Sequence, residues 1–517
     1  MQSSRSFFPV SLSILAVFAA GTAGAQVLRL TKITDWDGAV RGTGDAPALH
    51  GGMVAFYGHE AASSATGVFT TQALGGGAFR TIARVGEPVP NHPGRTFGNF
   101  DNPSTYGGRV AFTGGWGSDS EGLYLSAGAG LDVLVDYIAG DPRPRFTFLG
   151  PEGVAFEAQD AYETPYFFPL QGGGYFRLAE RNEPAPGGGT FATFSPLPRR
   201  GASFGGGLAS FTGYVNHATG VNVGVYTNDV STDQLGLIAN WNTPMPGQAV
   251  NFEYFNYSDT DGEQVAFLGS EGYIYFGGHA GVYAAPVGSD GNGPFTLVAQ
   301  IGDPAPGSGV PFEQFGQVAV DDGLIVFAGY LDSNTQPNHG LYGYRDGVLF
   351  KIIDNGDALF GRDAFDFIFT ARGLDRNQLV FRARYIDPNG PYGLGYGLYV
   401  ATLDGGLSLL GPTTLPRGTT VTFEAVGAAA GEQVLFVLGL GGFGHGWCGR
   451  GVCLDLLDPI MLLAGAIADG QGLATLPVFI PQNAPAGVEL GLQTVVLRAA
   501  GGPRSLASNT LAVQIGS

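Results

Sequence analysis

The chain has 517 residues, with 25 lysines and arginines against 44 aspartates and glutamates, which gives a formal net charge of −19. A surface of this sign repels polyanions, which excludes nucleic acid as a partner. The 87 glycines, 37 phenylalanines and 21 tyrosines exclude a disordered chain and are typical of many short strands joined by tight turns.

Residues 1–25 have the pattern of a secretory signal peptide. Arg5 supplies a basic start, an apolar run extends from Phe7 to Ala20, and Ala23-Gly24-Ala25 matches the small-residue cleavage pattern. The apolar run is too short to span about 30 Å of hydrocarbon, and no later run is long and apolar enough to do so. We therefore expect cleavage after Ala25, no transmembrane segment in the mature protein, and a secreted, periplasmic or cell-surface location.

A repeated unit fills residues 26–410. Its first marker is a strand that ends in apolar-apolar-Phe, and it occurs seven times, at Val54–Phe56, Val110–Phe112, Val154–Phe156, Ala209–Phe211, Val265–Phe267, Ile325–Phe327 and Leu379–Phe381. Its second marker is a Gly-apolar-aromatic strand, which ends at Phe69, Tyr124, Tyr226, Tyr283, Tyr342 and Tyr399. Further strands flank these two in most units. Four strands per unit and seven units predict an all-β fold, a seven-bladed β-propeller rather than an open solenoid.

Two segments compete to close the predicted ring. Val27–Ile33 precedes the first unit and resembles a fourth strand, and Leu407–Leu410 follows the last unit. The sequence does not decide between them.

Residues 411–517 lack the repeat, and their short strands predict a small β-sandwich. Cys448 and Cys453 are the only cysteines, and in an exported protein we expect them to form a local disulfide. The alternative is a zinc site that adds His445 and Asp455, but the spacing is not a familiar zinc pattern.

The sequence contains no catalytic signature and predicts no metal site or cofactor, with one weak alternative. Asp259 and Asp261 have the density of oxygen ligands that calcium favours, although Asp261-Gly262 is also a hairpin signal. Asp321-Asp322-Gly323 and Asp375–Asn377 occupy matching turn positions.

The loops after the second strands are the long ones and should lie together on one face of the disc. They and their flanks carry aromatic and histidine side chains that are suited to stacking on sugars or gripping peptides. The predicted binding residues are Tyr57, His59, Trp116, Tyr214, His217, Tyr275, His279, Tyr330, His339 and Tyr392. The alternative is that these rings only pack their own loops.

The order Gly-Asp-Pro-x-Pro-Gly, Phe-x-x-Phe, Val-Ala-Phe and Gly-Leu-Tyr is best matched by Gly302–Gly307, Phe312–Phe315, Ile325–Phe327 and Gly340–Tyr342. It resembles tandem repeats of secreted bacterial β-propeller-type proteins whose function is uncharacterised. The stretch from Cys448 to Leu497 looks like a β-rich module appended to exported bacterial proteins and is similar to surface-association modules. Neither resemblance implies catalytic residues.

The leading functional prediction is a monomeric, exported, non-catalytic binding or surface-associated protein that recognises a glycan, peptide or protein partner on the long-loop face. The rival is a polysaccharide hydrolase or lyase, which would need two carboxylates about 5 to 10 Å apart. Its candidates are Glu60, Asp119, Glu163 and Glu271. A third alternative is a purely structural envelope component.

Overall fold

The computed structural model describes residues 27–35, 37–42, 47–73, 79–117, 120–127, 130–137, 142–158, 164–171, 174–194, 203–218, 220–272, 279–332, 338–355, 357–387, 393–403, 407–412, 414–440, 448–449, 452–454, 456, 459–470, 472–498, 505–508 and 511–516. The predicted signal peptide, residues 1–25, lies outside the described residues.

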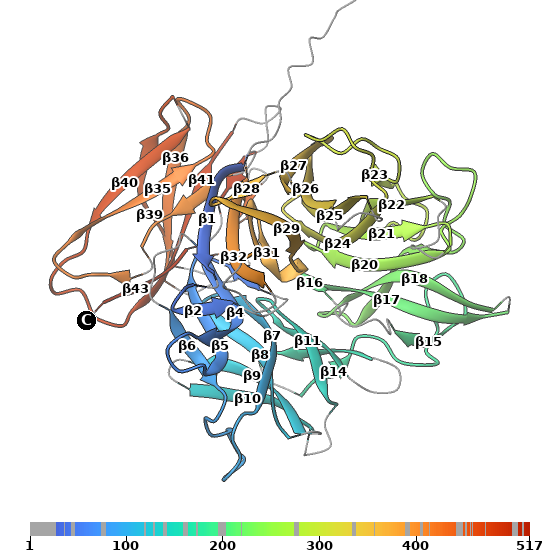
Figure 1. The fold of residues 1–517 in the computed structure, drawn as a ribbon, viewed down its shortest axis with the longest axis horizontal. Coiled ribbons are helices and arrows are strands. Elements are labelled where there is room, and N and C mark those ends of the chain that lie inside the picture. Colours follow the sequence, from blue (N-terminus) through green and yellow to red (C-terminus); the bar gives the residue numbers. More distant parts are fainter. Residues whose placement is uncertain are drawn as a thin grey trace, which may run out of the picture.

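Residues 27–403 form seven antiparallel sheets around one axis, as the blades of a β-propeller (Figure 1). The first strand of each blade contacts the first strand of the next, and contacts between β30 and β3 complete the ring. In blades 1, 4 and 7 the first strand is interrupted, and both of its pieces pair with the second strand.

The strands are as follows, blade by blade. Blade 1 contains β2 (Val40–Gly42), β3 (Ala48–His50), β4 (Met53–Glu60), β5 (Thr66–Gln72) and β6 (Arg80–Arg84). Blade 2 contains β7 (Asn99–Tyr106), β8 (Arg109–Gly117), β9 (Ser120–Ala127) and β10 (Gly130–Asp136). Blade 3 contains β11 (Pro144–Leu149), β12 (Gly153–Ala158), β13 (Pro165–Pro169) and β14 (Phe176–Arg177). Blade 4 contains β15 (Thr190–Phe194), β16 (Ser203–Gly205), β17 (Leu208–His217), β18 (Gly220–Asp229) and β19 (Gln234–Asn240).

Blade 5 contains β20 (Tyr254–Thr260), β21 (Gln264–Ser270), β22 (Ala280–Pro286) and β23 (Thr296–Gln300). Blade 6 contains β24 (Gln314–Asp321), β25 (Leu324–Asp332), β26 (Asn338–Arg345) and β27 (Val348–Asp354). Blade 7 contains β28 (Ala358–Leu359), β29 (Arg362–Ile368), the 3-10 turn η2 (Ala371–Gly373), β30 (Leu374–Asp375), β31 (Gln378–Ile386), β32 (Leu394–Leu403) and β1 (Val27–Thr34). The predicted all-β propeller is confirmed, with one sheet for each of the seven predicted units.

The glycines and aromatic residues of the repeat pack as one unit. Residues two apart on a strand face the same side, so the ring of Tyr342 lies over Gly340. A Cβ atom at Gly340 would lie 3.1 Å from the Tyr342 hydroxyl, and one at Gly329 would lie 2.5 Å from Cε1 of Phe312. Phe312, Phe327 and Tyr342 have ring centroids 4.9 to 5.9 Å apart. The spacing of the motif therefore follows from ring packing over bare backbone.

The hydrophobic cores lie between neighbouring blades. Ala266 and Leu268 of blade 5, for example, pack in one cluster with Phe315 and Phe327 of blade 6. Each blade thus buries both of its faces against its neighbours, which explains why the chain is so rich in phenylalanine.

The strand β1 closes the ring, because it pairs antiparallel with β32 and takes the fourth place in blade 7. Ile33 is 8% exposed and belongs to a cluster with Val380, Leu398 and Val400. Of the two predicted closing segments, the N-terminal one is the closing strand.

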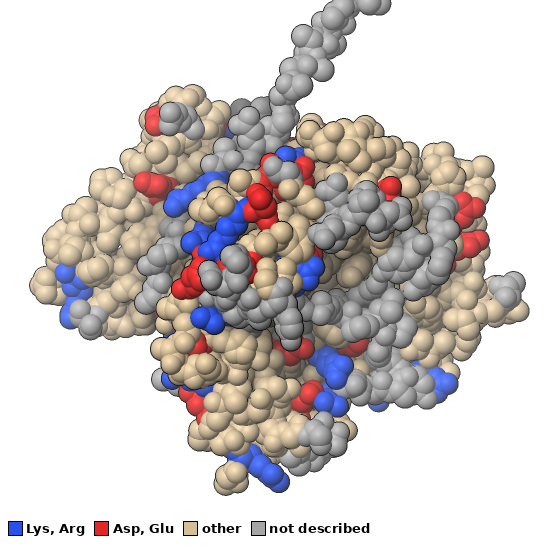
Figure 2. Space-filling model, viewed as in Figure 1, with Lys and Arg blue, Asp and Glu red and all other residues tan. Residues whose placement is uncertain are grey.

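Charged side chains reinforce this closure. Arg362, at the start of β29, lies 2.9 Å from Asp37, just beyond β1, and 3.3 Å from Asp387, just beyond β31. Figure 2 shows acidic and basic side chains side by side over the region of β1, β28 and β29, whereas the C-terminal module presents a mainly uncharged surface in this view. The ion pairs therefore join the N-terminal segment to the last blade.

The C-terminal module is a β-sandwich, as predicted. One sheet has the order β33 (Ser408–Leu410), β35 (Thr420–Val426) and β40 (Leu473–Phe479). The other has the order β34 (Thr414–Leu415), β43 (Leu511–Ile515), β41 (Glu489–Val496), β36 (Gln433–Gly439) and β39 (Ile460–Ile467), and β42 (Leu506–Ala507) pairs with β41. The segment Leu407–Leu410, the second candidate for closing the ring, contains β33. Because β33 pairs with β35, this segment belongs to the C-terminal module.

The two cysteines lie opposite each other on a short ladder. Strands β37 (Cys448–Gly449) and β38 (Val452–Cys453) pair antiparallel with Cys448 in register with Cys453. The described residues do not include the two side chains, so the disulfide stays a prediction. The alternative zinc ligands His445 and Asp455 lie outside the described residues.

Candidate functional site

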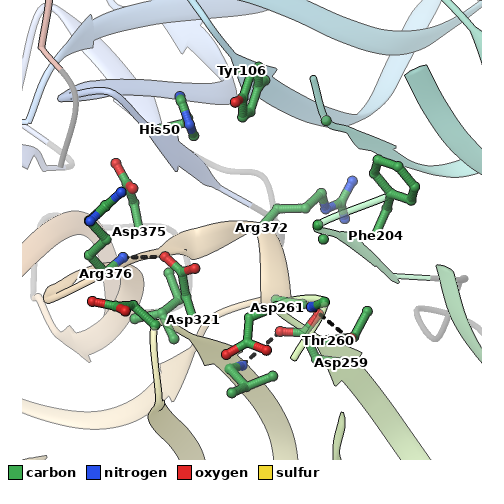
Figure 3. Close-up of a pocket in the computed structure, with 18 of the residues that line it drawn as sticks. His50, Tyr106, Phe204, Asp259, Thr260, Asp261, Asp321, Arg372, Asp375 and Arg376 are labelled. Atoms are coloured by element: carbon green, nitrogen blue, oxygen red, sulfur yellow. Dashed lines mark hydrogen bonds between the residues drawn. The ribbon is translucent and has the colours of Figure 1, made fainter. Parts of the chain in front are cut away.

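A cavity of about 740 Å³ opens at one end of the propeller axis (Figure 3). We call it the channel-mouth pocket. Every blade contributes the end of its first strand or the hairpin that follows it, namely Leu49 and His50, Ser104–Tyr106, Phe148–Pro151, Phe204–Gly206, Asp259–Glu263, Val320–Asp322, and Leu374–Arg376. We call this side of the disc the hairpin face. It lies opposite the long loops that follow the second strands.

A repeated hydrogen bond between neighbouring blades shapes the pocket wall. The last residue of a first strand, or in blade 5 the residue just after it, accepts a hydrogen bond from a backbone N–H in the next hairpin. The pairs are Asp261 Oδ2 with Gly323 N at 3.4 Å, Asp321 with Arg376 N, Asp375 Oδ2 with Gly51 N at 2.8 Å, and His50 Nδ1 with Gly107 N at 3.3 Å. These acceptors satisfy N–H groups that the meeting of two hairpins removes from water.

Asp259 is the most deeply buried carboxyl of the wall. It is 1% exposed, and its Oδ2 accepts a hydrogen bond of 2.7 Å from Val320 N in the next blade. Its Oδ1 has no hydrogen-bond partner among the described residues. Burial raises the pKa of Asp259 to about 7, against the opposing effect of the Val320 N–H. The carboxyl therefore holds its proton in mildly acidic solution.

The pKa of Asp321 is raised as well. Burial and the neighbouring Asp375 raise it well above the ordinary value. The carboxylates of blades 5, 6 and 7 thus form one acidic side of the pocket, as Figure 3 shows.

Aromatic rings form the facing side of the pocket. The rings of His50 and Tyr106 lie 4.0 Å apart between centroids at an angle of 36°. Phe148 and Phe204 line the pocket beside them. Figure 3 shows His50 and Tyr106 across the cavity from Asp259 and Asp261, whereas Asp375 lies next to His50.

Arg372 crosses the pocket from blade 7. It lies in η2, and its Nη1 donates a hydrogen bond of 2.7 Å to the backbone oxygen of Thr147 in blade 3. Two blades separate these residues around the ring, so the side chain bridges the axis. Burial lowers the pKa of Arg372 to about 10, which leaves it charged at neutral pH. The pocket thus combines acceptors, a cationic donor and aromatic faces.

The structure describes eight of the ten predicted binding residues, which lie toward the other ends of the strands, and none of these eight lines the channel-mouth pocket. The rings that it brings close are contacts at the ends of strands and with the turns next to them, namely Tyr57 with His59, Trp116 with His92, His217 with Trp241, and Tyr330 with His339. His217 and His279 are exposed, and Tyr57, His59, Tyr214 and Tyr330 are half-buried.

Two of the other predicted residues are buried. Trp116 is 9% exposed, and His339 is 2% exposed and accepts a hydrogen bond of 2.7 Å from Phe367 N. Tyr275 and Tyr392 lie outside the described residues. A ligand on the long-loop face therefore stays a prediction.

The hairpin at Asp261 uses its carboxylate within the turn. Asp261 Oδ1 accepts hydrogen bonds from Glu263 N at 3.0 Å and Gln264 N at 2.9 Å. Among the described residues, no group of three or more histidine, cysteine, aspartate or glutamate side chains is placed to hold a metal ion. Calcium at Asp259 and Asp261 stays untested.

Of the carboxylates named for the hydrolase alternative, Glu60 and Glu271 lie at the ends of second strands, on the other face. Glu60 is hydrogen-bonded to Ser63 at 2.7 Å and paired with Arg84, and Asp119 and Glu163 lie outside the described residues.

No helix in the described part of the chain is long and apolar enough to cross a membrane.

Comparison with known proteins gives a family of unknown function and distant similarities of fold. Residues 166–387, less than half of the chain, match the model of a family of unknown function (DUF7453). The match runs from β13 to the end of β31. No curated protein matches the sequence.

Among solved structures, the polysaccharide lyase Uly1 is 8% identical with a TM-score of 0.44, covering 70% of this chain and 90% of that one. The β-propeller domain of Cps50 (Swd1) from Myceliophteria thermophila is 9% identical with a TM-score of 0.33, covering 69% and 98%. The catalytic domain of the Coprinopsis cinerea GH62 α-L-arabinofuranosidase is 13% identical with a TM-score of 0.24, covering 61% and 94%. The sheet order described above, rather than these similarities, carries the assignment of the propeller.

Proposed function

We propose that this protein is an exported, non-catalytic binding protein that holds a neutral sugar residue of a glycan in the channel-mouth pocket. The observation that carries the proposal is the meeting of carboxylates, a guanidinium and a close pair of aromatic rings in one cavity of about 740 Å³. That volume is within the range of small-molecule sites, which are concave and carry a few convergent polar groups.

The mixture of charges favours a hydroxyl-rich ligand. Each sugar hydroxyl both donates and accepts hydrogen bonds, so it is matched by Asp375 on one side and Arg372 on the other. The flat face of a sugar ring packs against an aromatic pair such as His50 and Tyr106. A polyanion would be repelled by the carboxylates of blades 5 to 7. An isolated cation would be repelled by Arg372 and Arg376.

The burial and the hydrogen bonds of the pocket carboxyls favour a binding role over a catalytic role in hydrolysis. Asp259 has 1% of its surface exposed, and Asp321 and Asp375 accept hydrogen bonds from backbone N–H groups of the next blade. A general acid must reach the oxygen that it protonates, within about 3 Å. Asp259 is therefore assigned to shaping the pocket wall, and Asp321 and Asp375 to accepting hydroxyl hydrogens at its surface.

The test is isothermal titration of the mature protein with neutral trisaccharides of glucose, galactose, mannose and xylose. We expect one member of this panel to bind at one site per chain. Arg372→Gln should weaken binding roughly tenfold or more, because hydrogen bonds to charged groups contribute about 1.5 to 3 kcal/mol. The matched control is Arg143→Gln, since Arg143 is also partly buried but is bonded to Glu121 in blade 2.

Three outcomes would count against the proposal. No binding by any member of the panel would refute it, and so would equal effects of the two arginine substitutions. Release of new reducing ends during incubation would instead favour the hydrolase alternative. Substitution of exposed His217 on the long-loop face tests the other predicted surface, and we expect no effect on the trisaccharide.

A further inference from the structure

The channel-mouth pocket has a wall that does not belong to the propeller. Ser505 and Ala507, which lie in and next to β42 of the C-terminal module, line the cavity together with the seven hairpins. The module approaches blade 1 as well, because a Cβ atom at Gly52 would lie 3.0 Å from Cδ1 of Leu511. Two parts of the chain therefore meet at the pocket.

Arg376 joins these two parts. Its Nη1 donates a hydrogen bond of 3.1 Å to the backbone oxygen of Ala507, and its backbone N–H is bonded to Asp321 of blade 6. Arg345, also in blade 6, lies 3.5 Å from the backbone oxygen of Arg376. Figure 3 shows Arg376 between Asp321 and Asp375 at the edge of the cavity. Arg376 is therefore held by blade 6 and contacts the module.

The segment that forms the wall is firmly held within the module. Thr494 N donates to Ser508 Oγ at 2.9 Å, Gln493 Nε2 donates to the Ser508 backbone oxygen at 2.8 Å, and Arg498 N donates to Ser505 Oγ at 3.0 Å. Gln493, Thr494 and Ser508 are each 0% exposed. Hydrogen bonds between buried groups are strengthened by the low local dielectric, so these three bonds hold the segment in place. A movement of the wall thus requires a movement of the whole module.

We propose that the C-terminal module is a structural part of the binding site, and that a ligand in the pocket fastens the module to the propeller through Arg376. This inference rests on the proposed function of the channel-mouth pocket. Contacts between domains of one chain resemble transient interfaces, so relative movement is the default unless something fixes them. A ligand that touches both parts stabilises their docked arrangement by its differential affinity for it. The module is then a binding element rather than only an attachment tail.

The test is hydrogen–deuterium exchange of the mature, full-length protein, with and without the neutral trisaccharide of highest affinity in the panel above. We expect the ligand to slow exchange in residues 505–508 as well as in residues 374–376. Arg376→Gln should weaken binding roughly tenfold and abolish the protection of 505–508, while the hairpin at residues 49–52 keeps its protection. Arg376→Lys retains a cationic donor and should restore part of both effects, and Arg143→Gln again serves as the control.

The outcomes separate this inference from the proposed function. Protection confined to the propeller hairpins, with no change in residues 505–508, overturns the role of the module and leaves the binding function standing. If Arg376→Gln binds the trisaccharide with the affinity of the wild type, the role of the module is likewise overturned and the binding function stands. If no trisaccharide binds, the proposed function and this inference fail together. Thermal unfolding of each variant shows whether the protein is folded, so that lost binding is not mistaken for lost structure.

Discussion

Asp259 offers a direct test of the packing at the hairpin face, through the substitution Asp259→Asn. In the folded protein burial raises the pKa of Asp259 from 3.8 to about 7. Between these two values the folded state holds one proton more than the unfolded state. The contribution of Asp259 to stability is therefore fully present below about pH 4 and is lost as the pH rises to about 7.

The size of the effect follows from the two pKa values. One pKa unit corresponds to about 1.4 kcal/mol, so a difference of about 3 units amounts to about 4 kcal/mol over the whole range. Asparagine has the shape of the protonated aspartate and keeps an oxygen acceptor for Val320 N, but it cannot ionise. Relative to the wild type, Asp259→Asn should become more stable by about 4 kcal/mol between about pH 4 and pH 7.5.

Urea denaturation of the mature protein and the variant at several pH values measures this difference. Asp321 has a raised pKa too, but it is present in both proteins and largely cancels in the comparison. The control is Asp132→Asn, which removes one carboxylate at an exposed position on β10 and so measures the general effect of losing a negative charge. A difference between Asp259→Asn and the wild type that stays constant across the range would refute the reasoning.

Further predictions concern closure and packing of the ring. Ile33→Ala removes a buried side chain from the closing strand, so the free energy of unfolding should fall by about 2 to 4 kcal/mol in urea denaturation. Val221→Ala is its control, because Val221 is 62% exposed and its change should be negligible. Gly329→Ala would place a Cβ atom 2.5 Å from the Phe312 ring and should cost about 1 to 3 kcal/mol in the same assay. Gly98→Ala is the control for that change, since its nearest contact would be 3.7 Å away; equal losses in both glycine variants would contradict the ring-packing explanation.

The blades were predictable because their signals repeat. The apolar-apolar-Phe strands are the second strands of all seven blades, and their partners with Gly-apolar-aromatic are third strands. Residues such as Phe327 and Tyr342 must be large and apolar for packing, and Gly340 must be small beneath the tyrosine ring. Because this packing requirement recurs from blade to blade, the same residue pattern recurs along the chain and can be recognised in one sequence.

The channel-mouth pocket was not predictable in the same way. Its members look like ordinary turn residues, because Asp261-Gly262 and Asp321-Asp322-Gly323 are typical of hairpins. The bond between Asp375 and Gly51 joins residues 324 positions apart and exists only once the ring is closed. Arg372 has no sequence context that marks it as a residue crossing an axis. The one available signal was the recurrence of aspartate at matching turns.

Ring closure by β1 also determines the order of events in folding. The first residues of the described chain pair with the last strand of the propeller, with Val27 opposite Leu403. Contacts so distant in sequence form slowly, since the chain between them must be ordered first. During synthesis the N-terminal segment therefore has no sheet partner until β32 has been synthesised. The ring stays open throughout that interval, and the channel-mouth pocket comes into existence only at its end.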